Sequence, residues 1–82
     1  MQINVLCNIH HDDEGNKWYN PVSEFNAVHG FIGDTAYKAY HVNIDKIVLV
    51  NPRTRTVFID CGADGFEFVL EPKSMKAVIE LL

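Results

Sequence analysis

The fold is decided by residues 44–70, which read IDKIVLVNPRTRTVFIDCGADGFEFVL. This stretch contains three runs rich in β-branched and aromatic residues, which are typical of strands. The three runs are Ile44–Val50, Arg55–Cys61 and Phe66–Leu70. Residues 51–54, Asn-Pro-Arg-Thr, suit a type I turn with Pro at its second position, and Asp64-Gly65 suits a tight turn that needs positive φ. Strands joined by such short turns can pair only as an antiparallel meander.

Outward from the meander, the sequence predicts a strand and two helices. Residues 3–9 alternate between apolar and polar side chains, as a strand with one buried face does. Asn20-Pro21 is typical of a helix start, and the helix would run to Gly30. A final helix is expected to begin at Pro72 and to pack a stripe of apolar side chains on the sheet. The stripe consists of Met75, Val78, Ile79 and Leu82.

Two segments between these elements are less regular. Residues 11–20 are polar and contain Gly15, so we expect an exposed loop that is anchored by Trp18 and Tyr19. Residues 31–42 fit either a helical turn or an extended edge strand. The sequence therefore predicts a single α+β domain over residues 1–82, with an N-terminal strand, a short helix, a three-stranded antiparallel meander and a C-terminal helix packed on the sheet.

Length and charge limit the class of protein. The 82 residues are 48% hydrophobic and 22% charged, which is ordinary for a globular domain. The longest apolar run, residues 47–50, is far shorter than the roughly 20 residues that span a bilayer. The chain opens without a basic segment before an apolar stretch, so we expect no secretory signal, a cytoplasmic location and no membrane partner. A net charge of −4 makes nucleic acid a less favoured partner than protein.

The sequence shows no pattern that we recognise as catalytic. It lacks a glycine-rich phosphate loop and a nucleophile elbow, so we expect neither an enzyme nor a cofactor. Cys7 and His10 have a spacing found in half of a zinc site, but the sequence contains no second pair of ligands with such a short spacing. The side chains of Cys7 and His10 should also lie on opposite faces of a strand. A zinc-stabilised fold therefore stays an alternative, and the expectation is that Cys7 and Cys61 remain thiols.

The predicted meander carries apolar side chains on both faces. Val57 and Ile59 point one way and Phe58 points the other. One terminal helix covers only one face, so the second needs a cover from the first half of the chain or from a partner. This pattern favours a homo-oligomer, most simply a dimer.

A second candidate for partner binding is the acidic loop with its two aromatic residues. Aromatic anchors beside charges are favoured in protein interfaces. The proposed partner-binding residues are Asp12, Asp13, Glu14, Trp18 and Tyr19. The leading hypothesis is a non-catalytic protein-binding or regulatory module, of the accessory or inhibitory kind that phages and plasmids carry and that acts on a host protein.

The alternative from another class is a nucleic-acid-binding module. Two arginines lie at the predicted turn of the basic hairpin, and a lysine lies on the neighbouring run. An arginine-bearing β-ribbon can enter a groove of DNA. The residues of this alternative are Lys46, Arg53 and Arg55.

Overall fold

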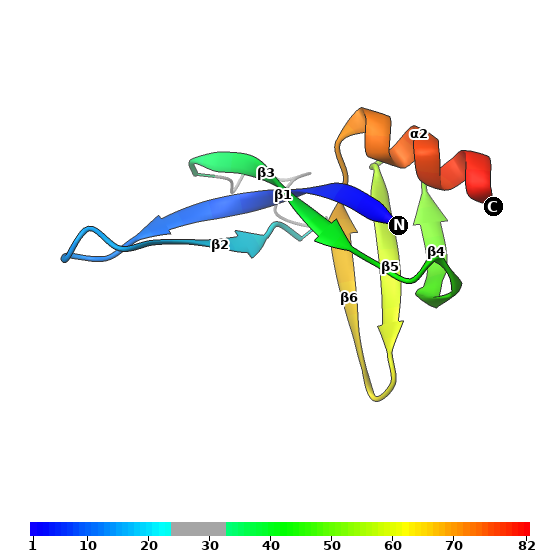
Figure 1. The fold of residues 1–82 in the computed structure, drawn as a ribbon, viewed down its shortest axis with the longest axis horizontal. Coiled ribbons are helices and arrows are strands. Elements are labelled where there is room, and N and C mark those ends of the chain that lie inside the picture. The colour runs from blue at the N-terminus through cyan, green and yellow to red at the C-terminus, as the bar shows by residue number, and fades with distance from the viewer. Residues whose placement is uncertain (24–32) are drawn as a thin grey trace.

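The protein is described from a computed structural model, which places residues 1–23 and 33–82. These residues form a small α+β domain with two three-stranded antiparallel sheets and a C-terminal helix (Figure 1). The domain measures 43 × 25 × 24 Å, and the long dimension comes from a hairpin that projects from the body. No helix in the described residues is long and apolar enough to cross a membrane.

The first sheet, sheet A, is built around the N-terminal strand. Its strands are β1 (Gln2–His11), β2 (Lys17–Pro21) and β3 (Thr35–His41), in the order β2-β1-β3. The predicted strand over residues 3–9 is confirmed and is longer than expected. Of the two possibilities left open for residues 31–42, the extended edge strand holds for the β3 part, while residues 31–32 lie outside the described residues.

The predicted exposed loop over residues 11–20 is wrong, because this segment is the turn and second strand of a hairpin. The side chain of Asp12 builds the turn by accepting hydrogen bonds from the backbone N–H groups of Glu14 at 2.9 Å and Asn16 at 2.8 Å. Gly15 adopts φ +85°, which glycine tolerates without strain. The polar strand β2 then holds its place through backbone pairing with β1.

The predicted helix start at Asn20-Pro21 is also wrong. Both residues belong to β2, where Pro21 pairs with Cys7 and Asn20 with Asn8. Proline fits here because β2 is an edge strand, so its missing N–H leaves no ladder bond unmade. The rest of the predicted helix, residues 24–30, lies outside the described residues.

The second sheet, sheet B, is the predicted meander. Its strands are β4 (Ile47–Asn51), β5 (Thr56–Cys61) and β6 (Asp64–Val69), in the order β4-β5-β6 and antiparallel throughout. The first strand begins later than predicted, because residues 44–46 form a 3-10 helix, η1 (Ile44–Lys46). Asn43 caps that turn by accepting a hydrogen bond from the N–H of Asp45 at 3.1 Å.

The two turns of the meander differ from expectation in position. The first spans Pro52–Arg55 and places Arg55 at φ 57°. The second uses Gly62-Ala63 instead of Asp64-Gly65, so the prediction of the second turn is wrong by two residues. Gly62 has φ +86° and takes the first central position, as in the type II′ turns that suit two-residue hairpins.

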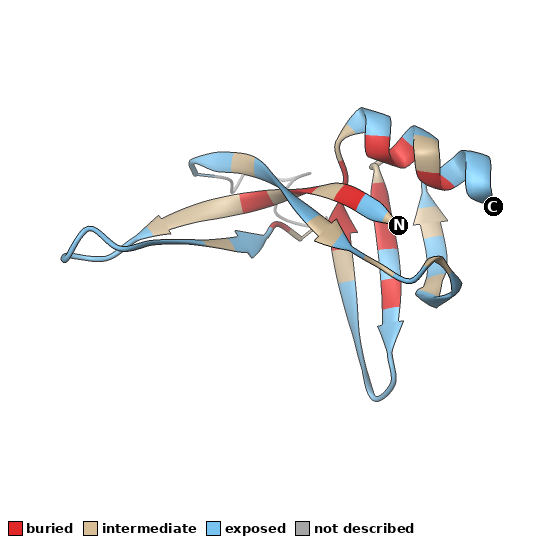
Figure 2. Cartoon of the chain, in the orientation of Figure 1, coloured by how far each residue is buried: buried red, intermediate tan, exposed pale blue. Residues whose placement is uncertain are grey.

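The predicted C-terminal helix is confirmed as α2 (Pro72–Leu81). Met75 and Val78 are buried as the stripe predicts, but Ile79 and Leu82 are exposed. Ser74 is buried in their place, and its hydroxyl accepts a hydrogen bond from the backbone of β1. The helix therefore packs by its first two turns, and its last turn projects past the sheet (Figure 2).

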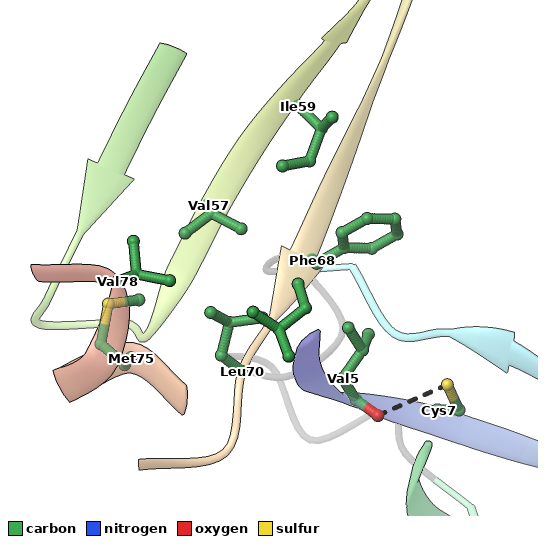
Figure 3. Packing of buried hydrophobic residues seen from close by; sticks show 9 residues of the cluster. Val5, Cys7, Val57, Ile59, Phe68, Leu70, Met75 and Val78 are labelled. Atoms are coloured by element: carbon green, nitrogen blue, oxygen red, sulfur yellow. Dashed lines mark hydrogen bonds between the residues drawn. The ribbon is translucent and has the colours of Figure 1, made fainter. Parts of the chain in front are cut away.

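The core lies where β1, sheet B and α2 meet (Figure 3). The inner face of sheet B, defined by Val57, Ile59 and Phe68, packs against β1 and α2. The two sheets are also joined along the free edge of β1, where Val5 forms a bridge with Leu70. The central part of the sheet is thus covered on this side by residues from the chain itself.

Candidate protein interface

The outer face of sheet B, opposite the core, carries two neighbouring apolar side chains that remain exposed. Leu49 on β4 and Phe58 on β5 are direct register partners, so their side chains lie side by side. Leu49 is 67% exposed and Phe58 is 38% exposed. We call these two residues, with the adjacent Val48, which is 57% exposed, the outer patch.

A β-bulge places Leu49 in the outer patch. Ile47 pairs with Ile59 and Leu49 pairs with Phe58, so β4 uses two residues where β5 uses one. In a regular strand Ile47 and Leu49 would share a face. The bulge at Val48 sends Ile47 inward and Leu49 outward, which is the arrangement that leaves Leu49 in solvent.

The ring of Phe58 lies close against the backbone of the glycine on the next strand. Gly65 of β6 lies directly under the ring, and a Cβ at that position would overlap ring atoms Cζ and Cε1. A shallow groove of about 160 Å³ runs beside the ring and includes Leu49 and Glu67. The outer patch therefore consists of an aromatic ring and two aliphatic side chains, with the carboxylate of Glu67 in the groove beside the ring.

The outer face is only partly open. Thr56, two residues before Phe58 on β5, and its register partner Val69 on β6 lie on the same side of sheet B as Phe58, and both are buried. The exposed apolar surface is thus confined to the part formed by β4 and the middle of β5. The sequence pattern indicated that Phe58 points away from the core, but it gave no sign that Leu49 would join it.

The acidic residues predicted to bind a partner lie at the tip of the β1–β2 hairpin. Asp12, Asp13 and Glu14 are all exposed in this turn, which lies at the opposite end of the molecule from β4 and β5 (Figure 1). Hydrogen bonds from Asn16, through its side chain and its backbone, hold the pKa of Asp12 below its ordinary value, and the N–H groups of Glu14 and Gly15 add to this effect. At least one of these carboxylates is thus used to build the turn.

The two aromatic residues of the predicted partner site point to opposite faces of sheet A. Trp18 is exposed and stacks on His10, with ring centroids 5.5 Å apart and planes inclined by 17°. Tyr19 faces the other side, where the Nζ of Lys38 lies 4.2 Å from its ring centroid. A flat partner can contact Trp18 or Tyr19, but one surface cannot include both.

The basic residues of the nucleic-acid alternative are also divided. Lys46 precedes β4, whereas Arg53 and Arg55 follow it in the turn to β5. The intervening strand is five residues long, which corresponds to about 17 Å at the rise of a β-strand. The structure therefore brings Arg53 and Arg55 to one turn and leaves Lys46 at the other end of the strand.

Cys7 and His10 of the zinc alternative do not face each other. Cys7 is buried in the core, with its Sγ 3.5 Å from the carbonyl oxygen of Val5 and 3.9 Å from the Tyr40 hydroxyl. His10 lies on the opposite face against Trp18. Burial raises the pKa of the Cys7 thiol, although the Tyr40 hydrogen bond and the charge of Lys38 act in the opposite direction. Within residues 1–23 and 33–82, no three His, Cys, Asp or Glu side chains gather as metal ligands would.

Comparisons of the chain with models of protein families, with curated proteins and with solved structures found no match.

Proposed function

We propose that this chain is a non-catalytic protein-binding or regulatory module that docks through the outer patch, with a second copy of itself as the simplest partner. The observation that carries the proposal is the pairing of Leu49 and Phe58, two large apolar side chains that are neighbours and are both exposed. Burying a leucine or phenylalanine side chain completely stabilises a complex by about 1.5–3 kcal/mol. These side chains offer contact area and supply no acid, base or nucleophile.

Self-association is favoured by the chemistry of the outer patch. Isolated apolar side chains are common on protein surfaces, whereas adjacent ones with a polar border are typical of interfaces. A two-fold dimer uses the same surface on both subunits, so an apolar patch placed against its own copy buries Leu49 and Phe58 twice. Accessory or inhibitory activity on another protein would use the same residues.

Light scattering after size-exclusion chromatography tests the self-association. The wild-type chain should be a dimer at high micromolar concentration, and Leu49→Glu should be a monomer because it places a charge in the contact. The matched control is Leu81→Glu, which changes a similarly exposed leucine at the end of α2 and should remain a dimer. A wild-type chain that stays strictly monomeric rejects the self-association.

Docking on a different protein has its own test. Wild type, Leu49→Glu and Leu81→Glu are used as baits with extract from the native host. A partner of the outer patch should be retained by wild type and Leu81→Glu and lost with Leu49→Glu. A partner that is retained equally by all three binds elsewhere and contradicts the assignment of the outer patch.

Nucleic-acid binding through Arg53, Arg55 and Lys46 is the alternative, and it has less support because Lys46 lies at the far end of β4. If it holds, the double variant Arg53→Ala with Arg55→Ala should lose retention on heparin. The zinc alternative is supported less still, since Cys7 and His10 point to opposite faces. Elemental analysis of the purified protein decides it, because a structural zinc would co-purify in stoichiometric amount.

A further inference from the structure

A cleft of about 400 Å³ opens between the two sheets, on the inner side of sheet B. It lies next to the buried core, between sheet B and the segment that runs from the end of β3 to η1. Its apolar lining includes Tyr40 from β3, Ile59 from β5, and Phe66 and Phe68 from β6. The volume is within the range of small-molecule sites, which are lined mainly by apolar and aromatic side chains.

The aromatic rings of this cleft form a continuous ladder. The ring centroids of Tyr40 and Phe68 are 5.7 Å apart with planes inclined by 26°, and those of Phe68 and Phe66 are 6.2 Å apart with planes inclined by 8°. Such spacings are favourable for aromatic pairs. Three rings from two different sheets thus follow one another in a stack, with Phe66 at one end.

The ladder ends at a ring that has open space beside it. Phe66 and Phe68 alternate with Glu67 and therefore share the inner face of β6, but Phe68 is 9% exposed and Phe66 is 54% exposed. An inward-facing phenylalanine that stays half exposed marks a part of the inner face that the described residues leave unfilled. A further flat ring can stack there and bury apolar area on both partners.

The border of the cleft offers a cation. Lys46 of η1 and His41 of β3 both line the cleft, and so does Asp60. The Oδ1 atom of Asp60 already accepts a hydrogen bond from the N–H of Gly62 at 3.0 Å. Lys46 brings an ammonium group to this border, and an ammonium group complements a carboxylate on a ligand.

We propose that this cleft is a binding site for a small planar aromatic carboxylate, whose ring stacks on Phe66 and whose carboxylate reaches Lys46. This site lies on the face of sheet B opposite the outer patch. It is therefore independent of the proposed docking function, and the Leu49→Glu variant should bind such a ligand as wild type does.

The first test uses 2-naphthoate as the probe and two-dimensional amide NMR of the full chain as the measurement. Saturable shifts should centre on Tyr40, His41, Phe66 and Phe68. The planar but neutral 2-naphthamide and the anionic but non-planar decahydro-2-naphthoate should each bind about fivefold more weakly. Shifts that centre on Leu49 and Phe58, or no saturable shifts up to millimolar 2-naphthoate, overturn the proposal.

Matched variants measure separately how much the Phe66 ring and the Lys46 charge contribute to binding. Phe66→Leu should weaken 2-naphthoate binding by about fivefold, whereas Phe58→Leu, the same change on the opposite face of sheet B, should leave it unchanged. Lys46→Gln should remove the preference for 2-naphthoate over 2-naphthamide. Circular dichroism confirms that each variant is folded. Equal weakening by both phenylalanine variants, or a preference that survives Lys46→Gln, contradicts the assignment.

Discussion

The backbone N–H of Asn4 donates a hydrogen bond of 2.8 Å to the hydroxyl oxygen of Ser74, which joins β1 to the first turn of α2. Two further bonds connect the same places: the side-chain amide of Asn4 donates to Glu71 Oε1 at 3.2 Å, and the N–H of Glu71 donates to the Asn4 carbonyl at 2.9 Å. Residues 70 positions apart in the chain thus satisfy the edge of β1 that β2 does not reach.

Replacing Ser74 by alanine should lower the free energy of unfolding by about 1–2 kcal/mol, because the Asn4 N–H would lose its partner beneath the helix. Urea denaturation followed by circular dichroism measures the change. Lys73→Ala, at the exposed neighbouring position, is the control and should stay within about 0.5 kcal/mol of wild type. Equal effects of the two variants would show that the hydroxyl does not hold β1.

Replacing Gly65 by alanine should destabilise the domain by about 1–3 kcal/mol, because the new methyl group would overlap the Phe58 ring. The cost should be much smaller in a Phe58→Leu background, and the double-mutant cycle measures this coupling. Gly33→Ala is the control, since a Cβ there meets nothing within 4 Å. Additive effects of the Phe58 and Gly65 changes would contradict the close approach of the ring.

The two cysteines should differ strongly in reactivity. A thiol reagent at neutral pH should modify Cys61, which is exposed, and leave Cys7, which is buried and whose pKa burial raises. Mass spectrometry of the native protein should show one adduct, and a second should form in denaturant. Cys61→Ser should show no adduct under native conditions. Rapid modification of Cys7 in that variant would indicate that the core opens easily.

Acid should loosen the β1–β2 turn only below the ordinary pKa of an aspartate, 3.8. Hydrogen bonds from Asn16 lower the folded-state pKa of Asp12. The carboxylate of Asp12 therefore stabilises the fold fully above pH 3.8, and this stabilisation is lost as the pH falls through the lower folded-state pKa. The amide shifts of Glu14 and Asn16, followed by NMR during acidification, measure this midpoint. Asp12→Asn should abolish the transition, and a midpoint above 3.8 would be the opposite of the expected direction.

Local patterns predicted β1, the three strands of sheet B and the last helix, but not the pairing that determines their exact bounds. Alternation over residues 3–9 and the proline at position 72 were sufficient for β1 and α2. The Asp64-Gly65 signal failed because a turn there would pair Ile59 with Leu70. In the structure Leu70 instead donates its N–H to Arg55 at 2.7 Å and bridges to Val5, so the contact with β1 determines the register.

The candidate interface was predicted only in part, for a related reason. The sequence indicated that Phe58 lies away from the core, but the bulge that turns Leu49 beside it has no signature in the run Ile47–Val50. The β1–β2 hairpin was missed because β2 has no apolar alternation and is held by backbone pairing and by the Asp12 turn. Trp18 and Tyr19, which the sequence placed in one binding loop, consequently lie on opposite faces of sheet A.

Leu70, Glu71 and Ser74 complete the hydrogen bonding along the edge of β1, and this affects how the protein folds during synthesis. The groups that complete the edge of β1 are translated more than sixty residues after β1 itself. Such contacts between distant parts of the chain raise contact order and slow folding. On the ribosome, the nascent β1 keeps an open strand edge until residues 70–74 have emerged, so the native pairing of this edge can form only after that point.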